Sequence, residues 1–352
     1  MKRTILVSMF GWLTVALFAV IPSGYYTSAE GKSADALRQA LYQKITSHTN
    51  VGYDGLYNVY PTSDVTADGK VWDMYSTCTW THGQKKCGSY DVVCDCYNRE
   101  HSVPQSWFSK ASPMVADAFH VYPTDGKVNG QRSNYEFGEC SGGTSLGGKA
   151  LGRLGKSTFT GYTSRGTVFE PDDQYKGDFA RTYFYMATCY ANKCSNWGNT
   201  FGSVSGLSQY GVDLFLKWHR QDPVSQKELD RNEAVYAKQK NRNPFIDCPE
   251  LAEHIWGTKK NVAWYQGQSP VDNIELQQFE VFPNPAKDFL MIVAENVGDV
   301  KYQIIDISGK ILMSGTTAVN ASLTVDGLDN GIYFIRMDFD NQTNLQKFII
   351  NK

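Results

Sequence analysis

The pattern of hydrophobic residues changes near residue 270, and this change constrains the fold more than any other feature of the sequence. Before it, apolar residues recur at helical spacing between stretches rich in Gly, Tyr and Cys; after it, short alternating runs are separated by turns. A linker containing Gly, Gln, Ser and Pro, 267–274, lies between the two patterns. The 352-residue chain is long enough for two domains. We expect an α+β domain at 34–266 and a small antiparallel β-sandwich at 275–352.

Helices are predicted in the first domain wherever apolar residues fall on one face at helical spacing. Ser225 and Glu228 form a capping box that begins one of these helices. The predicted helices cover 34–47, 177–190, 212–220 and 225–240, with a short one after residue 247. Segment 90–99 mixes β-branched, aromatic and Cys residues, and it is predicted to be a strand.

The N-terminus has the features of an export signal. Lys2 and Arg3 precede an apolar run over 5–21, and small residues follow it. The alternative is a membrane anchor, but the run is marginally short and is interrupted by polar and Gly residues. We expect a cleaved signal peptide over 1–29. Because no later segment is apolar enough to span a bilayer, we expect no stable membrane insertion.

The cysteines agree with export. All eight lie between residues 78 and 248, and an even number in a secreted chain favours disulfides. The alternative is a zinc site made of Cys78, Cys87, Cys94 and Cys96, but these spacings lack a CxxC pair. The pairing cannot be deduced from the sequence, although Cys189 and Cys194 are close enough to bond.

The charge of the chain gives no general attraction to nucleic acid. The formal net charge is −2, and residues 275–352 hold 10 acidic and 6 basic residues. The region before them is therefore close to neutral, and any basic groove must be local.

Two short segments combine the residue types that metal-assisted phosphodiester cleavage needs. The first, 98–104, sets the carboxylate of Glu100 beside the imidazole of His101, and the second, 128–134, supplies amide oxygens and a guanidinium. Consecutive strand residues point to opposite faces, so both side chains reach one site only where the strand ends, and Pro104 provides such an end. An isolated Glu-His pair is more often a surface carboxylate beside a packed histidine. The second segment shifts the balance towards a site.

These segments belong to a longer ordered series of motifs. The series is Asn-Arg-Glu-His-(x)2-Pro at 98–104, His-Val-Tyr-Pro-Thr-Asp-Gly at 120–126, Val-Asn-Gly-(x)-Arg-Ser-Asn-Tyr at 128–135, and matches at 180–183, 217–219, 222–224 and 241–247. In this order the motifs resemble the secreted bacterial endonuclease I family, over roughly 34–264. The resemblance implies a ββα-metal (His-Me finger) nuclease core stabilised here by disulfides, in which a strand provides the base and the following helix a metal ligand.

The resemblance also implies roles for individual residues. His101 would be the general base, neutral at pH 7 with a near-normal pKa. Glu100 and Asn129 would bind one divalent cation, Mg²⁺ or in its place Mn²⁺ or Ca²⁺. The expected substrate is DNA, with RNA as a further candidate, bound through its phosphates without strong sequence preference by a monomer. The expected products carry 5′-phosphate and 3′-hydroxyl ends.

The sequence leaves the cation that contacts the phosphate open. Some family members supply an Arg from an insertion after the base, whereas this chain has only Lys110 there. Arg132 is the candidate replacement, and the equal alternative is a structural arginine paired with a core carboxylate. Arg99, His120 and Asn134 are expected to support the site.

The tail has its own resemblance. Val-Phe-Pro-Asn-Pro at 281–285, Ile-Asp-Ile-Ser-Gly-Lys at 305–310 and Gly-Ile-Tyr-Phe-Ile-Arg at 331–336 are similar to the C-terminal sorting domain of the type IX secretion system. This implies outer-membrane secretion machinery as a partner and a secreted, extracellular or cell-surface location; the alternative is a generic binding domain. For the whole chain, the rival interpretations are a ribonuclease on the same scaffold and a noncatalytic surface-binding protein.

Overall fold

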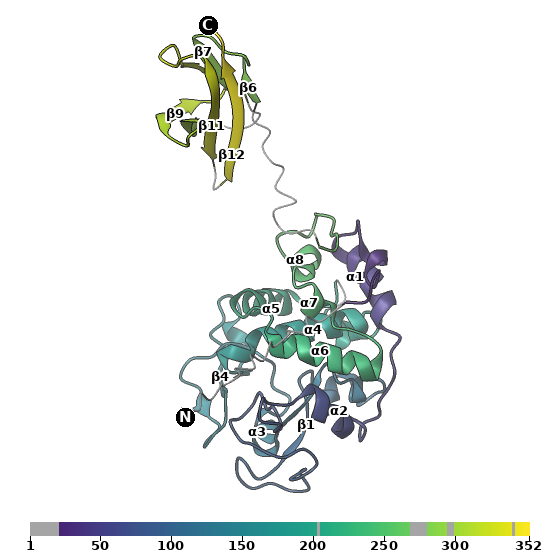
Figure 1. Cartoon of the computed structure of the whole chain (residues 1–352). Helices are drawn as coiled ribbons and strands as arrows, with labels where there is room; N and C mark the ends of the chain where they lie inside the picture. The colour runs from purple at the N-terminus through teal and green to yellow at the C-terminus, as the bar shows by residue number, and fades with distance from the viewer. Residues whose placement is uncertain (1–20, 203–204, 268–279, 294–298, 340–341) are drawn as a thin grey trace, which may run out of the picture. The chain divides into compact units, whose positions relative to one another are not determined.

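The computed structural model describes residues 21–202, 205–267, 280–293, 299–339 and 342–352. Most of the predicted signal peptide and of the predicted linker lie outside the described residues. The chain divides into two compact units, 1–266 and 267–352, which are treated separately here (Figure 1). Within the described part of the chain, no helix is both long enough and apolar enough to cross a membrane.

The first unit is a mixture of helices and short strands. Its helices are α1 Ala34–Ile45, α2 Leu56–Ser63, α3 Gly126–Arg132, α4 Lys176–Cys189, α5 Gln209–Gln221, α6 Gln226–Gln239, α7 Pro244–Asp247 and α8 Leu251–Ile255. Its strands are β1 Tyr97–His101, β2 Val121–Asp125, β3 Thr144–Ser145, β4 Arg153–Lys156 and β5 Thr167–Glu170. The four long predicted helices are confirmed as α1, α4, α5 and α6. The predicted strand at 90–99 begins later, at Tyr97, because a disulfide-bonded loop occupies most of that segment.

Helix α4 is the centre of the hydrophobic core. Every residue from Lys176 to Cys189 is buried, and α5 packs along it more extensively than any other helix. The aromatic rings of Tyr183 and Phe215 stack between these two helices with centroids 4.4 Å apart. Helix α1 adds a stripe of three fully buried residues at four-residue spacing, Leu37, Leu41 and Ile45. This core provides the support on which the short strands rest.

A hairpin of β1 and β2 followed by α3 forms the functional end of this unit. The two strands pair antiparallel, with Glu100 opposite Tyr122 and His101 opposite Val121. Helix α3 starts directly after β2, because the Asp125 side chain accepts a hydrogen bond from the Val128 amide and caps the helix. In Figure 1, β1 and α3 lie beside α2, and α3 contacts both strands of the hairpin. A second antiparallel sheet, in the order β3-β4-β5, lies further along the chain.

Two disulfides close the loop that precedes β1. Cys78 bonds Cys94, and Cys87 bonds Cys96, so the four cysteines of the alternative zinc site are all in disulfides. The other four cysteines are free and buried, and these are Cys140, Cys189, Cys194 and Cys248. The suggested Cys189–Cys194 bond is therefore wrong. The Cys189 thiol faces the carbonyl of Ile45, whereas the Cys194 thiol faces those of Ala187 and Gly206.

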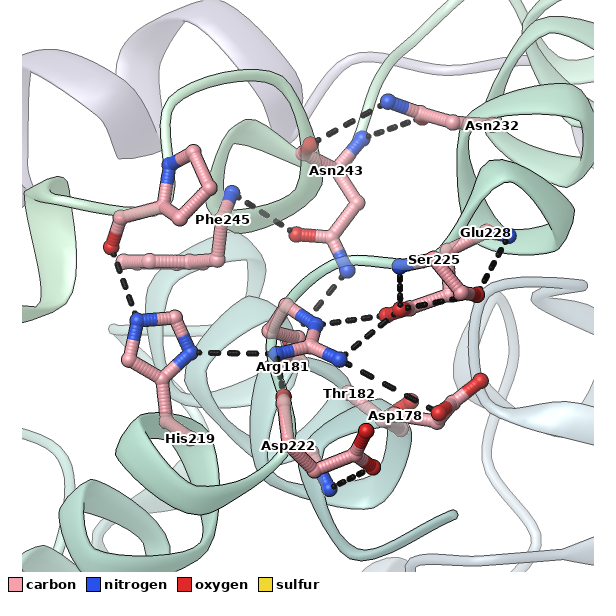
Figure 2. Close-up of polar contacts among 12 residues, drawn as sticks. Asp178, Arg181, Thr182, His219, Asp222, Ser225, Glu228, Asn232, Asn243 and Phe245 are labelled. Carbon is pink, nitrogen blue, oxygen red and sulfur yellow. Dashed lines mark hydrogen bonds and ion pairs between the residues drawn. The ribbon is translucent and has the colours of Figure 1, made fainter. Parts of the chain in front are cut away.

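Motif residues outside the hairpin hold the helices together (Figure 2). Arg181 of α4 is fully buried, and its guanidinium pairs with both carboxylate oxygens of Glu228 on α6. The same group donates to the carbonyl of Asp222 at 2.8 Å, just after α5. Asn243 at the start of α7 donates to the carbonyl of Arg181 at 3.2 Å. These contacts give Arg181 a structural role and tie four helices to one guanidinium.

The second unit consists of two antiparallel sheets around one core. Its strands are β6 Glu280–Phe282, β7 Phe289–Val293, β8 Asp299–Asp306, β9 Ile311–Ala318, β10 Ser322–Thr324, β11 Gly331–Phe339 and β12 Gln342–Ile350. The sheet orders are β10-β7-β6 and β12-β11-β8-β9. Buried residues from both sheets, such as Ile292 and Ile335, belong to one hydrophobic cluster. The predicted antiparallel fold of the tail is confirmed.

Candidate active site

Strand β1 ends in a pocket of about 340 Å³. Glu100 and His101 both line it although they are consecutive, because His101 is the last residue of the strand and Pro104 follows shortly after. Asn129 of α3 lines the same pocket. The structure thus brings these three residues together. The remaining lining residues are Tyr53, Tyr57, Cys87, Gly88, Tyr90, Asn98, Arg99, Pro104, Gln105, Ser133 and Asn134.

The Glu100 carboxylate is buried with one oxygen engaged and one open. Its side chain is 3% exposed, and Oε1 accepts hydrogen bonds from the Tyr75 hydroxyl at 2.9 Å and from Arg132 Nη1 at 3.0 Å. Within the described residues no hydrogen bond reaches Oε2. Burial raises the pKa of Glu100 to about 7, and the opposing effects of Arg132 and Tyr75 do not cancel it. The carboxylate therefore carries a desolvation cost that a cation in the pocket would offset.

The His101 ring has a fixed orientation and a defined tautomer. Its Nε2 lies 3.0 Å from the carbonyl oxygen of Val115. Because a carbonyl only accepts, Nε2 carries the hydrogen in the neutral ring, and Nδ1 is left as the proton acceptor. Tyr53 stacks on the ring with centroids 5.8 Å apart and an interplanar angle of 23°. The surrounding contacts leave the imidazole little rotational freedom.

The expectation of a near-normal His101 pKa is wrong. Burial, followed by the neighbouring His120, lowers the pKa of His101 to about 3. The ring is consequently neutral throughout the physiological range, as a base requires, but for a different reason from the one expected.

Asn129 presents its oxygen because its nitrogen is already engaged. Nδ2 donates to Oδ1 of Asn98 at 2.6 Å, which leaves Oδ1 of Asn129 free for another partner. The residue is half-buried on α3, one turn after the Asp125 cap. Next to it, Gly130 packs directly against the Tyr90 ring, where a larger side chain would collide.

The geometry of Arg132 matches the structural alternative. The residue is 1% exposed, and it does not line the pocket. Nη1 donates to Glu100 and to the carbonyl of His101, both at 3.0 Å, while Nη2 donates to the carbonyl of Ser102 at 2.7 Å. The guanidinium thus lies behind the two acidic and basic side chains and cannot reach a phosphate in the pocket.

The three expected supporting residues occupy different positions. Arg99 lines the pocket, and its Nη1 donates to the Asp54 carboxylate at 2.8 Å. His120 is fully buried behind His101, with ring centroids 5.5 Å apart, and its Nε2 bonds the carbonyl of Met114. Asn134 is exposed at the pocket rim.

Two contacts to the site were not predicted from the sequence. Tyr75 binds Glu100 from a loop outside every quoted motif, and no local signal distinguishes it from the other tyrosines. Tyr53 stacks on His101 and is likewise remote in sequence. Asn98, which orients Asn129, does lie within the first motif, and its short distance from Glu100 could have indicated a role.

Comparison with known proteins gives the family. The model of the Endonuclease I family matches residues 33–250, more than half of the chain. This chain belongs to the Endonuclease I family. A second match, at 280–351, is to the secretion system C-terminal sorting domain. Both resemblances seen in the sequence are thereby confirmed.

Relatives of the chain in this family are secreted or periplasmic nucleases. An extracellular ribonuclease of Bacillus amyloliquefaciens is 35% identical over 241 residues, which is 66% of this chain and 78% of the relative. An extracellular deoxyribonuclease of Aeromonas hydrophila is 27% identical over 170 residues, 48% of this chain and 57% of the relative. Endonuclease-1 of Buchnera aphidicola, strain Bp, is 28% identical over 133 residues, 38% of this chain and 46% of the relative.

Family membership and the sorting tail identify the chain as an endonuclease that is secreted or displayed at the cell surface. This removes the alternative of a noncatalytic surface-binding protein. It also places the Endonuclease I match over the unit that holds the pocket.

Proposed function

We propose that this member of the Endonuclease I family hydrolyses phosphodiester bonds of DNA with one divalent cation, and that the β1–β2–α3 segment is its ββα-metal core. The observation that carries the proposal is the convergence of Glu100, His101 and Asn129 on one pocket. The function expected from the motifs also includes 5′-phosphate and 3′-hydroxyl products and little sequence preference.

The oxygen ligands at the pocket fit a hard divalent cation. The open oxygen of Glu100 and the free Oδ1 of Asn129 are a carboxylate and an amide, which Mg²⁺, Mn²⁺ and Ca²⁺ all accept. Two protein oxygens leave further positions for water and for phosphate, as is usual for Mg²⁺. When bound there, the cation would polarise the phosphate and stabilise the leaving 3′ oxygen. The buried, partly uncompensated charge of Glu100 supports this assignment.

His101 would remove the proton from the attacking water through Nδ1. The bond from Nε2 to Val115 holds the ring in the tautomer that this step needs. A pKa near 3 means that protonated, inactive imidazole is not populated at neutral pH. A phosphate that enters the pocket brings negative charge close to the ring and raises its pKa, which makes it a better base in the complex.

Ribonuclease activity is the second candidate, and the relative that is 35% identical favours it, since its name is extracellular ribonuclease. Relatives named for DNA cleavage favour DNA. Incubating the same preparation with a DNA and an RNA oligonucleotide of one sequence, with Mg²⁺, separates the two candidates by the ratio of initial rates.

A plasmid-nicking assay with His101→Ala tests the proposal. Loss of the general base is expected to lower turnover roughly 10²–10⁴-fold while nucleic-acid binding persists. EDTA should abolish nicking of the unchanged protein. The matched control is His82→Ala, because His82 lies outside the pocket and should retain activity. Nicking that survives His101→Ala or EDTA would refute the assigned chemistry.

For the second unit we propose recognition by the outer-membrane secretion machinery. The match of 280–351 to the sorting domain supports this, since the function of such a domain lies in export and not in catalysis. No catalytic constellation was expected there, because residues 275–352 contain neither Cys nor His.

A further inference from the structure

The pocket contains an arginine held between two tyrosine rings. The guanidinium carbon of Arg99 lies 3.5 Å from the ring centroid of Tyr53 and 4.7 Å from that of Tyr57. On its other side, Tyr53 stacks on His101. Lys86 extends the row outwards, with its Nζ 4.9 Å from the centroid of Tyr57. Cations and aromatic rings thus alternate from the base to the pocket rim.

Arg99 carries the one permanent positive charge among the described side chains that line this pocket. Its Nη1 donates to the carbonyl of Tyr53 and to the Asp54 carboxylate, both at 2.8 Å. Within the described residues, no hydrogen bond uses Nε or Nη2. A guanidinium with unused donors in a pocket is suited to a phosphate, which it can contact through two parallel hydrogen bonds.

The two tyrosines make this arginine a prepared ligand. Cation–π contacts on two sides limit its rotamers, so less conformational entropy is lost when a phosphate binds. The Tyr53 ring also lies between Arg99 and His101, which keeps the cation near the base without direct contact between them. The partner of Arg99, Asp54, has a side chain that is 98% exposed, so water screens its charge.

We propose that Arg99, Tyr53 and Tyr57 form a phosphate-binding subsite for the substrate strand, next to the bond that is cleaved. The proposal rests on the proposed function and assigns to Arg99 the phosphate contact that the buried Arg132 cannot make. The ligand is a backbone phosphate of DNA or RNA, and the tyrosine rings position the guanidinium.

Salt-dependent binding tests the subsite directly. Affinity for a fluorescent DNA duplex is measured by anisotropy in EDTA, where cleavage is suppressed, over a series of KCl concentrations. Arg99→Met should weaken binding roughly tenfold at low salt, as expected for one charged hydrogen-bonding group. It should also reduce the slope of log affinity against log salt by about 1, because one phosphate contact is lost. Arg99→Lys should restore the slope.

The matched control is Arg220→Met. Like Arg99, Arg220 is paired with a carboxylate, that of Glu253, but it lies outside the pocket. The control changes net charge equally and should leave the salt slope unchanged. With Mg²⁺ present, the Arg99→Met effect should raise KM more than it lowers kcat.

The outcomes separate the subsite from the proposed function. If the unchanged protein cleaves DNA but Arg99→Met has the same salt slope as Arg220→Met, the subsite is refuted and the proposed function stands. If the unchanged protein neither binds nor cleaves nucleic acid, the proposed function itself fails. A reduced slope in Arg99→Met that Arg99→Lys restores supports the subsite.

Discussion

Replacing Glu100 by Gln is expected to stabilise the metal-free protein while it abolishes activity. Gln keeps an oxygen for the hydrogen bonds from Tyr75 and Arg132 but removes the buried charge. The pKa of the carboxyl is raised from an ordinary 4.5 to about 7 in the folded protein. The gap between these pKa values corresponds to about 3 kcal/mol of unfolding free energy.

The sign of the effect follows from proton linkage. The folded protein holds the Glu100 proton more tightly than the unfolded chain, so the stabilising contribution is complete below pH 4.5. It is lost as the pH rises from 4.5 through about 7. Gln does not titrate and keeps its contribution at every pH. The advantage of Glu100→Gln should therefore grow by about 3 kcal/mol from acidic to neutral pH, or roughly 6–12 °C in melting temperature.

Tryptophan fluorescence in EDTA is a suitable readout for this prediction. All eight tryptophans precede residue 267, so the signal reports on the unit that holds the pocket and not on the tail. Adding Mg²⁺ at pH 8 should raise the melting temperature of the unchanged protein, because a ligand bound to the folded state stabilises it. It should not affect Glu100→Gln. A stability difference that stays constant with pH would show that burial does not perturb this carboxyl, and the reasoning would be refuted.

Two further changes probe the second ligand and the support of the site. Asn129→Ala should raise the Mg²⁺ concentration needed for half-maximal nicking, whereas Asn134→Ala, at the rim, should not; an unchanged requirement would remove Asn129 from the ligands. Arg181→Met should cost about 3–5 kcal/mol in denaturant unfolding, because the Glu228 carboxylate is left buried without its partner. Activity per folded molecule should be retained, and a loss of turnover without a loss of stability would contradict the structural role given to Arg181.

The sequence predicted the parts of this protein that depend on local patterns. Helical periodicity located α1, α4, α5 and α6 because each buries a continuous apolar face. The capping box at Ser225 and Glu228 is present, with both reciprocal hydrogen bonds. The motifs also indicated Glu100, His101 and Asn129, which the structure gathers at one pocket.

What the sequence could not provide depends on contacts between distant segments. Cys87 bonds Cys96 and not the nearer Cys94, because the loop geometry and not the spacing decides the pairing. Tyr75 reaches Glu100 from 25 residues away, and only the folded chain brings them together. The low pKa of His101 arises from burial, which no residue type near it in the sequence reveals.

The two arginines near the site illustrate how burial divides identical chemistry between roles. Arg132 lies behind Glu100 and engages one carboxylate oxygen, which fixes the carboxylate plane and leaves the other oxygen directed to the pocket. This single contact does not neutralise the group, since its pKa stays raised to about 7. A stronger ion pair would lower that pKa and compete with a cation for the same charge. The partial pairing instead orients the ligand and leaves it in need of a cation, while Arg99, at the pocket surface, is free to meet the substrate.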